Sequence, residues 1–284
     1  MFQNGLVLEG GGMRGLFTAG VLDFFIDKDI EFAEVIGVSA GACHSCSYVS
    51  KQRGRARSST IDHIDDKNFC SLYSLFKTGD LFCAKFSYDD IPNRLNPFDY
   101  DTFNKSNTKL FSTVTNVETG QAEYIRLCEM HEDIQAVRAS ASLPLVSQIV
   151  EYKGKKYLDG GIADSIPLKK IEADGYLKNV VVLTQPKGFI KQKNKAMGLI
   201  ELKYKEYPKL IEQMANRHNV YNDTLDYIYK QEEVGLCFVI QPKENLDIGR
   251  VEKSKEKLDL AYSLGYECAK ENYDTMTEFL KSQV

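Results

Sequence analysis

The sequence contains no tryptophan, only four histidines, and no apolar run of the roughly 18 residues that a membrane-spanning helix needs. Its first residues, Met1-Phe-Gln-Asn4, lack the basic and apolar segments of a secretory signal, so we expect a cytoplasmic protein. Basic residues are not in excess either: 36 Lys and Arg stand against 40 Asp and Glu, for a net charge of −4. Because nucleic acid attracts strongly basic surfaces, we expect no nucleic-acid partner.

The sequence contains seven cysteines, an odd number, and they are scattered along the chain. This distribution favours reduced thiols over a disulfide framework. One close pair, Cys43-His-Ser-Cys46, fits either a redox motif or a stretch of small residues that packs closely, and we favour packing. The four histidines and this pair show no zinc-site spacing. We therefore expect no metal and no cofactor.

The first fifty residues alternate between strand-like and helix-like patterns. Gly15–Lys28 has apolar residues at a helical period, Val35–Val38 is a short apolar strand, and a helix is expected from Ala40 to Val49. Such alternation predicts an α/β fold with a mostly parallel central sheet sandwiched by helices. Residues 1–195 are expected to form the main domain. Residues 196–284, with long helical patterns at 199–214, 221–231 and 251–280, should form a helical C-terminal layer packed on it.

Two glycine-rich turns follow the first two predicted strands. In Gly37-Val-Ser-Ala-Gly41 the glycines would let the turn expose Ser39 as a nucleophile. In Gly10-Gly-Gly-Met-Arg-Gly15, the N–H groups of Gly10, Gly11 and Gly12 could stabilise an oxyanion. The Gly10–Gly15 motif also fits a plain strand-to-helix turn or a dinucleotide fingerprint. However, it lacks the acidic residue that a dinucleotide site places at the end of the second strand.

A serine nucleophile needs a neighbouring base. Among the histidines, His218 would complete the chain order Ser39…Asp159…His218, but we expect it to lie between helices of the C-terminal layer. Asp159 ends a predicted strand and is followed by Gly160 and Gly161, which would let its carboxylate turn toward a neighbouring strand end. An ordinary Asp-Gly hairpin turn explains the same residues equally well.

Four motifs in this order resemble those of the patatin-like phospholipase family, and they span about 160 residues: Gly10–Gly15, Gly37–Gly41, Ala139-Ser-Ala-Ser-Leu-Pro144 and Asp159-Gly-Gly161. The resemblance implies a Ser39–Asp159 dyad without metal or catalytic histidine, and hydrolysis of acyl esters of lipids. It also implies that Gly10–Gly15 forms the oxyanion hole with Arg14 at the basic position. Pro144 would be structural. More loosely, Arg217–Asn222 resembles the tail of a bacterial branch.

Several features leave alternatives open. The basic run Lys51–Arg57 fits a solvated loop or contact with phosphate head groups, and the aromatic segment Asn68–Phe103 fits a core cap, a lid or an acyl groove. Both permit peripheral membrane contact. We expect a lipid ester as substrate. The alternatives to the dyad enzyme are an esterase that uses His218 and a non-catalytic lipid-binding protein. The sequence does not indicate the oligomeric state.

Overall fold

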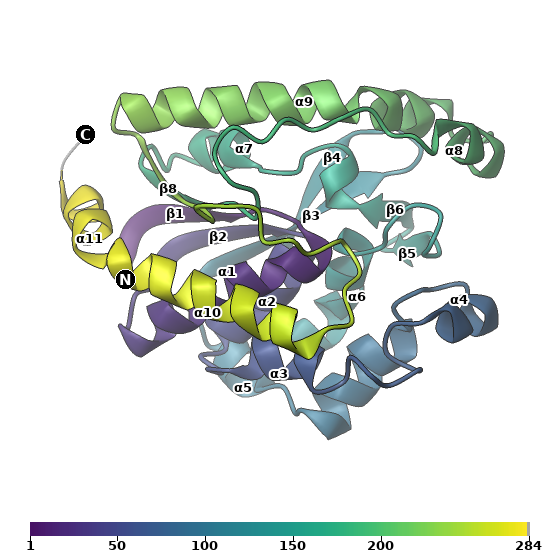
Figure 1. Ribbon diagram of the computed structural model, residues 1–284, viewed down its shortest axis with the longest axis horizontal. Helices are drawn as coiled ribbons and strands as arrows, with labels where there is room; N and C mark the ends of the chain where they lie inside the picture. Colours follow the sequence, from purple (N-terminus) through teal and green to yellow (C-terminus); the bar gives the residue numbers. More distant parts are fainter. Residues whose placement is uncertain (283–284) are drawn as a thin grey trace.

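A computed structural model describes residues 1–282, in which a mixed sheet lies between two layers of helices (Figure 1). The strands are β1 (Phe2–Leu8), β2 (Phe32–Val38), β3 (Lys109–Asn116), β4 (Ala122–Leu127), β5 (Val150–Tyr152), β6 (Lys155–Asp159), β7 (Asn179–Val182) and β8 (Cys237–Ile240). The α-helices are α1 (Gly15–Asp27), α2 (Ala40–Val49), α3 (Arg55–Ile61), α4 (Leu72–Thr78), α5 (Tyr100–Asn104), α6 (Met130–Ser140), α7 (Leu168–Ala173), α8 (Met197–Lys203), α9 (Pro208–Glu233), α10 (Lys255–Glu271) and α11 (Tyr273–Lys281).

The strand order across the sheet is β5-β6-β3-β2-β1-β7-β8, with β4 paired to β3. The pairs β1–β2, β2–β3, β1–β7 and β7–β8 are parallel, and the three pairs β3–β4, β3–β6 and β5–β6 are antiparallel. The prediction of an α/β fold with a mostly parallel sheet between helices is confirmed. The turns after β1 and β2 therefore lie at the same edge, where the carboxyl ends of parallel strands meet.

The register of the sheet brings the end of β6 to this same edge. Val38, the last residue of β2, pairs with Thr113 of β3. The next residue of β3, Val114, pairs with Asp159, the last residue of the antiparallel strand β6. The turn after β2 and the end of β6 thus lie on opposite sides of one strand at nearly the same level.

Alternate residues of the strands enter the two helical layers. Val7, Ile36 and Val181 belong to the apolar core under α7 and α9. Leu6, Leu8, Val35 and Val180 belong to the core under α1, α2 and α6. This alternation follows from the period of two in a strand, and Figure 1 shows α9 along one face of the sheet and α1, α2 and α10 along the other.

Helix α10 crosses α1 at unusually close range. A Cβ atom on Gly265 of α10 would lie 1.9 Å from the Phe17 carbonyl oxygen, and one on Gly20 of α1 would lie 2.0 Å from the Tyr262 carbonyl oxygen. Tyr262 also donates a hydrogen bond to Asp23 of α1 at 2.7 Å. Since β8 pairs with β7 of the preceding segment, the division of the chain at residue 195 stays a proposal.

The helix boundaries after residue 195 differ from those predicted. Helix α8 ends at Lys203, and α9 then runs unbroken from Pro208 to Glu233. Proline is favoured in the first turn of a helix, where its missing N–H costs nothing, so Pro208 starts α9 instead of continuing the earlier helix. The polar stretch 216–219 lies inside α9, and the prediction that His218 lies between helices was therefore wrong.

The apolar stretches 72–76 and 81–86 of the aromatic segment both have the character of short amphipathic helices, but only the first forms one. Residues 72–78 form α4, but residues 81–86 do not form a separate helix, since Cys70 and Phe82 make an isolated β-bridge. A wide π-type helix follows at Phe86–Leu95 and includes Pro92. In residues 1–282, no helix combines the length and the apolar character needed to cross a bilayer. The cytoplasmic location stays a prediction.

Candidate active site

Ser39 lies in a strained turn between β2 and α2. Its φ of 54° and ψ of −119° fall outside the regions that a serine ordinarily adopts. A Cβ atom on Gly37 would lie 2.6 Å from the backbone of Ala42, and one on Gly41 would lie 2.6 Å from the Leu8 carbonyl oxygen. Both flanking positions therefore require glycine. The conformation is that of a nucleophile elbow, in which backbone strain presents the serine at the tip of a strand.

The end of α6 holds both strand ends in place. The Ser39 amide donates to Oγ of Ser140 at 2.8 Å, and the Asp159 amide donates to the Ser142 carbonyl at 2.9 Å. The segment Ala139–Pro144 thus joins the elbow to the end of β6. It acts mainly through backbone and hydroxyl groups, and Ala141 and Leu143 line the neighbouring cavity.

Asp159 is buried at the end of β6. Its Oδ1 accepts a hydrogen bond from the Gly161 amide at 2.8 Å, whereas its buried Oδ2 has no hydrogen-bond partner among the described residues. A Cβ on Gly160 would lie 2.1 Å from the Thr113 carbonyl oxygen, which explains the glycine after the aspartate. One oxygen of the carboxylate, Oδ1, is therefore fixed by a hydrogen bond, and the other, Oδ2, remains available to accept a proton.

Burial raises the pKa of Asp159, while the positive charge of Arg217, the Ser39 hydroxyl and the Gly161 amide all act to lower it. The Ser39 hydroxyl is therefore close enough to stabilise the Asp159 carboxylate. Among the described residues, however, no hydrogen bond within 3.5 Å joins the two side chains. Catalytic hydrogen bonds of enzymes without substrate are often long and shorten only when substrate binds. The position of the Asp159 carboxylate and its raised pKa therefore suit proton transfer from the Ser39 hydroxyl.

The glycine-rich turn after β1 lies directly against the elbow. A Cβ on Gly10 would lie 3.1 Å from the Ser39 Cβ, and one on Gly11 would lie 2.7 Å from Oγ1 of Thr184. Gly12 has a φ of +57°, and its amide, like those of Gly10 and Gly11, donates to no group within residues 1–282. Gly15 packs against Ala40, where a Cβ would lie 2.6 Å from the alanine Cβ.

The side chain of Arg14 extends away from Ser39. Its guanidinium donates to the Ile248 carbonyl at 3.4 Å, and its buried Nε has no partner in the described chain. It lines a separate hollow formed with residues 185–189, Asn245 and Ile248, which Ser39 does not line. Only the backbone of Arg14 belongs to the turn beside Ser39, and its part in an oxyanion hole stays a prediction.

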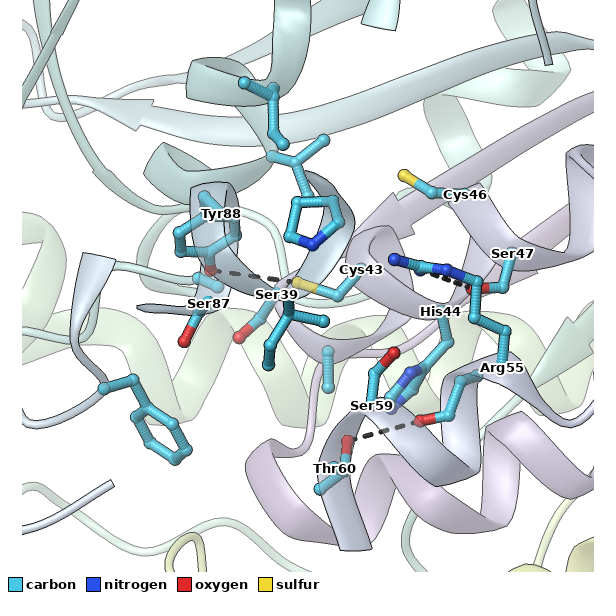
Figure 2. A pocket seen from close by; sticks show the side chains of 18 of the residues that line it. Ser39, Cys43, His44, Cys46, Ser47, Arg55, Ser59, Thr60, Ser87 and Tyr88 are labelled. Carbon is cyan, nitrogen blue, oxygen red and sulfur yellow. Dashed lines mark hydrogen bonds between the residues drawn. The ribbon is translucent and has the colours of Figure 1, made fainter. Parts of the chain in front are cut away.

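A cavity of about 190 Å³ opens beside Ser39 (Figure 2). Helix α2 supplies one wall, with Ala40, Cys43 and His44. The aromatic segment Asn68–Phe103, for which the sequence left a core cap, a lid and an acyl groove open, supplies another wall: Phe69, Phe82, Ser87, Tyr88, Ile91, Pro92 and Phe98. Most of these side chains are apolar, so the segment lines the cavity as well as covering the core.

The basic run at 51–57 is largely neutralised. Lys51 pairs with Glu31, Arg53 with Asp27, and Arg57 with Asp259. The fourth cation, Arg55, turns inward, stacks over the Phe98 ring at 4.9 Å and reaches the wall of the cavity. These pairings match a surface loop better than a phosphate-binding one.

Cys43 and Cys46 are free thiols on the cavity side of α2. Burial raises the pKa of Cys43 to about 11 and raises that of Cys46 further. Because only a thiolate reacts readily, the two cysteines are inert at neutral pH, which favours the packing interpretation over the redox one.

Among the described residues, neither His44 nor His218 forms a hydrogen bond with Ser39 or Asp159. His44 lines the cavity, and burial lowers its pKa to about 4, so it is neutral. His218 lies within α9, with Nδ1 3.1 Å from the Ala215 carbonyl oxygen of the same helix. It is the neighbouring Arg217 that reaches the end of β6, since its Nε donates to the Gly161 carbonyl.

Three basic residues near the site carried no assigned role in the sequence interpretation: Lys191, Arg217 and Arg250. Arg217 belongs to the Arg217–Asn222 stretch, whose resemblance to a bacterial branch was noted without a function. Arg217 and Tyr221 are four residues apart, so they share one face of α9. This spacing could have indicated that Arg217 and Tyr221 act on the same side of α9, but only if the stretch had been predicted to be helical.

Family models and one curated relative match parts of this chain. The family model described as patatin-like phospholipase matches residues 6–170, and a model described as a domain of unknown function (DUF6363) matches residues 207–281. The uncharacterised protein YjjU of Escherichia coli (strain K12) is 30% identical over 202 residues, or 65% of this chain and 54% of YjjU. The chain thus spans about half the length of that curated relative. The crystal structure of VipD from Legionella pneumophila aligns with 97% of this chain and 67% of its own, at 14% identity and a TM-score of 0.47.

The first family model covers more than half of the chain and includes the glycine-rich turn, the elbow, the end of α6 and Asp159. These are the segments that the structure brings together at one edge of the sheet. The chain therefore belongs to the patatin-like phospholipase family.

Proposed function

We propose that the protein is a serine acyl hydrolase that cleaves carboxylic esters of phospholipids or lysophospholipids through a Ser39–Asp159 dyad. One observation carries the proposal: a strained elbow places Ser39 at the edge of a cavity and near a buried carboxylate whose Oδ2 has no hydrogen-bond partner among the described residues. A buried carboxylate oxygen without a hydrogen-bond partner is destabilising, so its presence points to a functional role. Family membership makes lipid ester hydrolysis the expected chemistry.

In the first half of the reaction, Oγ of Ser39 attacks the ester carbonyl carbon and its proton passes to Oδ2 of Asp159. The carbonyl oxygen becomes an oxyanion and accepts hydrogen bonds from the amides of Gly11 and Gly12, helped by the N-terminus of α2. The carbon–oxygen bond to the alcohol then breaks, and the alcohol leaves with the proton from Asp159. An acyl ester of Ser39 remains.

In the second half, Asp159 takes a proton from a water molecule, which attacks the acyl carbon. The tetrahedral intermediate collapses, Ser39 recovers its proton from Asp159, and the fatty acid leaves. The raised pKa of Asp159 suits both roles, because a base with higher proton affinity accepts the serine proton more readily. The apolar cavity beside Ser39 offers a place for the acyl chain.

Labelling with a fluorophosphonate probe tests this proposal. We expect wild type to be labelled, Ser39→Ala not to be labelled, and Asp159→Asn to be labelled at least a hundredfold more slowly. His218→Ala should label like wild type. Loss of labelling in His218→Ala as deep as in Ser39→Ala would favour a triad, and an unlabelled but folded wild type that binds lipid would favour a non-catalytic protein.

A further inference from the structure

Helix α4 turns apolar side chains toward solvent. Leu72, Tyr73 and Phe76 are all exposed, and Phe76 is 89% exposed. Residues four apart share one face of a helix, so Leu72 and Phe76 lie side by side. The opposite face attaches α4 to the fold, because Ser74 is buried and Leu75 packs against the apolar core beneath it. The outer face of α4 is therefore apolar without being part of the core.

Helix α8 and the loop before it show the same pattern. Ile200 is buried under the helix, whereas Leu199 is 62% exposed and Leu202 is 75% exposed. Ile190, in the preceding loop, is exposed as well. Single exposed apolar side chains are normal on a protein surface, but a concentration of them marks an interaction site.

A short stretch of chain joins α4 to α8. The Leu145 carbonyl accepts a hydrogen bond from Nζ of Lys203 at 3.3 Å, and the Leu145 amide donates to the Tyr204 hydroxyl at 3.1 Å, beside the end of α8. Three residues later, the Gln148 amide donates to Oδ1 of Asp80 at 2.8 Å, just after the end of α4. Because four residues span at most about 14 Å, the ends of the two helices are near each other. Figure 1 shows both helices at the same end of the molecule, on the right of the view.

The same stretch begins at the candidate active site. The Ser142 carbonyl accepts the Asp159 amide, and the next residue, Leu143, lines the cavity beside the elbow. Phe69 and Phe82, which flank α4 in the sequence, line that cavity too. The exposed face of α4 is therefore carried by the part of the chain that forms the cavity wall.

Unpaired lysines accompany the exposed apolar side chains. Residues 67–79 contain two lysines and no acidic residue, and residues 190–203 contain four lysines and one glutamate, in a chain whose net charge is −4. Four of these lysines are exposed and form no ion pair within 4.0 Å among the described residues: Lys67, Lys77, Lys193 and Lys195. The outer face of α4 and the segment 190–202, which together we call the docking surface, thus combine apolar groups with uncompensated positive charge.

This combination matches an anionic lipid surface. Apolar side chains of such a surface element enter the boundary between head groups and acyl chains, while lysines are attracted to the anionic head groups. Tyr73 fits the same environment, because its ring lies 5.1 Å from Nζ of Lys67 and 5.5 Å from Nζ of Lys77, and tyrosine favours membrane–water interfaces. Protein–protein interfaces are depleted in lysine, so a protein partner fits this composition less well.

We propose that the docking surface binds the protein to membranes that contain anionic phospholipids, with Phe76 and Leu202 entering the lipid. The choice of lipid as the partner rests on the proposed function. The contact is assigned to α4 and to 190–202 instead of the basic run 51–57, whose cations are mostly paired within the protein. Binding through this end would bring the wall of the cavity to the membrane, where lipid esters are found.

Flotation of the full-length Ser39→Ala protein with vesicles tests the surface without hydrolysis. We expect binding to vesicles in which a third of the lipid is phosphatidylglycerol, and at least tenfold weaker binding to pure phosphatidylcholine. Phe76→Asp and Leu202→Asp should each weaken binding at least tenfold. Leu177→Asp is the matched control, since Leu177 is 56% exposed but precedes β7, at the opposite edge of the sheet. Equal binding by all three variants would overturn the proposal.

The contribution of charge is tested separately. The double variant Lys193→Gln/Lys195→Gln should bind the anionic vesicles at least tenfold more weakly and pure phosphatidylcholine unchanged. Added salt should weaken the binding of wild type more than that of the double variant, because salt screens exposed charges. Binding that is indifferent to both salt and phosphatidylglycerol would contradict the part assigned to the lysines.

The absence of tryptophan from the chain allows a direct readout of insertion. Phe76→Trp places a single fluorescent side chain where an aromatic ring already stands. Val234→Trp places one at a position that is 66% exposed and precedes β8, at the opposite edge. On anionic vesicles, emission from position 76 should shift to shorter wavelength and be quenched by brominated phospholipid, whereas emission from position 234 should not change. Unchanged emission from position 76 on vesicles that bind the protein would overturn the assignment of α4.

A second copy of the chain is the other occupant that such a surface could take. Sedimentation velocity should give the same oligomeric state for wild type and Phe76→Asp. A dimer that dissociates in Phe76→Asp, in a protein that binds no vesicle, would assign the surface to self-association and overturn the membrane proposal.

Kinetics separate this inference from the proposed function. Phe76→Asp should leave kcat/KM unchanged for a short-chain ester dissolved as monomers, and should lower the rate of hydrolysis of vesicle lipid at least tenfold. A wild type that is labelled at Ser39 but binds no vesicle would overturn the docking surface alone. A protein that binds vesicles through Phe76 and Leu202 but is never labelled at Ser39 would overturn the hydrolase proposal alone.

Discussion

The amide of Ser39 donates a hydrogen bond to Oγ of Ser140, which lies 101 residues further along the chain. Two residues later, the Ser142 carbonyl accepts the amide of Asp159. One short segment at the end of α6 therefore fixes both members of the proposed dyad. The third motif contributes hydrogen-bonding geometry without itself taking part in the chemistry.

Ser140→Ala should slow the enzyme by loosening the elbow. The variant leaves the buried Ser39 amide without its acceptor, which costs about 1–3 kcal/mol. We expect fluorophosphonate labelling to slow at least tenfold and the urea midpoint to fall. Ser45→Ala on α2 is the matched control, because that buried hydroxyl donates only to the Ala42 carbonyl within its own helix. Normal labelling by Ser140→Ala would show that the elbow is rigid without this bond.

The parts of the site that could be predicted are those encoded locally. A strand, a glycine-rich turn and a helix follow one another within a few residues, so the turns Gly10–Gly15 and Gly37–Gly41 could be located from the sequence, although their roles were suggested only by the four motifs together. The steric need for glycine at Gly37 and Gly41 has the same local origin. The fold class followed from the same alternation of strands and helices.

Arg217→Gln should move the acid limb of the pH–rate profile to higher pH. The dyad needs Asp159 deprotonated, so activity is lost as pH falls through the raised pKa of that carboxyl. Arg217 holds this pKa down, and its removal should raise the pKa further. The measurement is kcat/KM against pH for a short-chain ester in wild type and variant.

The pH dependence distinguishes two roles for Arg217. A positioning role that acts through charge shifts the acid limb, whereas a merely structural role lowers the rate at every pH without moving it. Arg217→Lys, which keeps the charge, should leave the limb closer to its wild-type position. Lys205→Gln, an exposed change elsewhere in the C-terminal part of the chain, serves as a surface control.

Gly265→Ala should destabilise the protein strongly. The new methyl group would lie 1.9 Å from the Phe17 carbonyl oxygen, and the two helices would have to separate. We expect a loss of about 2–3 kcal/mol in the free energy of unfolding. Gly198→Ala in α8 meets nothing within 4 Å and should be neutral or slightly stabilising. Urea denaturation of both variants checks this, and equal midpoints would mean that α10 can shift freely on α1.

His44 should make the fold sensitive to acid. Its folded pKa of about 4 lies below its ordinary value of 6.5, so between these values the unfolded chain binds a proton that the folded chain does not. Stability from this group is complete above pH 6.5 and is lost as pH falls to 4, by about 3 kcal/mol. His44→Gln should therefore lose less stability than wild type between pH 7 and 4.5, as measured by urea midpoints. His131→Gln at an exposed position should lose as much as wild type.

The remaining features depend on contacts between distant segments. Arg217 and Arg250 come from a helix and a loop, and no local pattern in the sequence brings their charges near Asp159. Polar residues at 216–219 suggested a break because isolated propensity disfavours helix there, but packing of Leu210, Met214, Tyr221 and Leu225 keeps α9 continuous. The direction of the Arg14 side chain is likewise set by Ile248, far along the chain.

Helix α9 brings Arg217 to the Gly161 carbonyl, two residues after Asp159, from a part of the chain that follows all four recognisable motifs. A gene copy interrupted after residue 195 would retain all four motifs and yet lack the helix that contacts the end of β6. Surveys of genomes that count such motifs would score the broken copy as functional. In this chain, the four motifs and the contact that α9 makes with the end of β6 are therefore separate properties, and finding the motifs does not establish the contact.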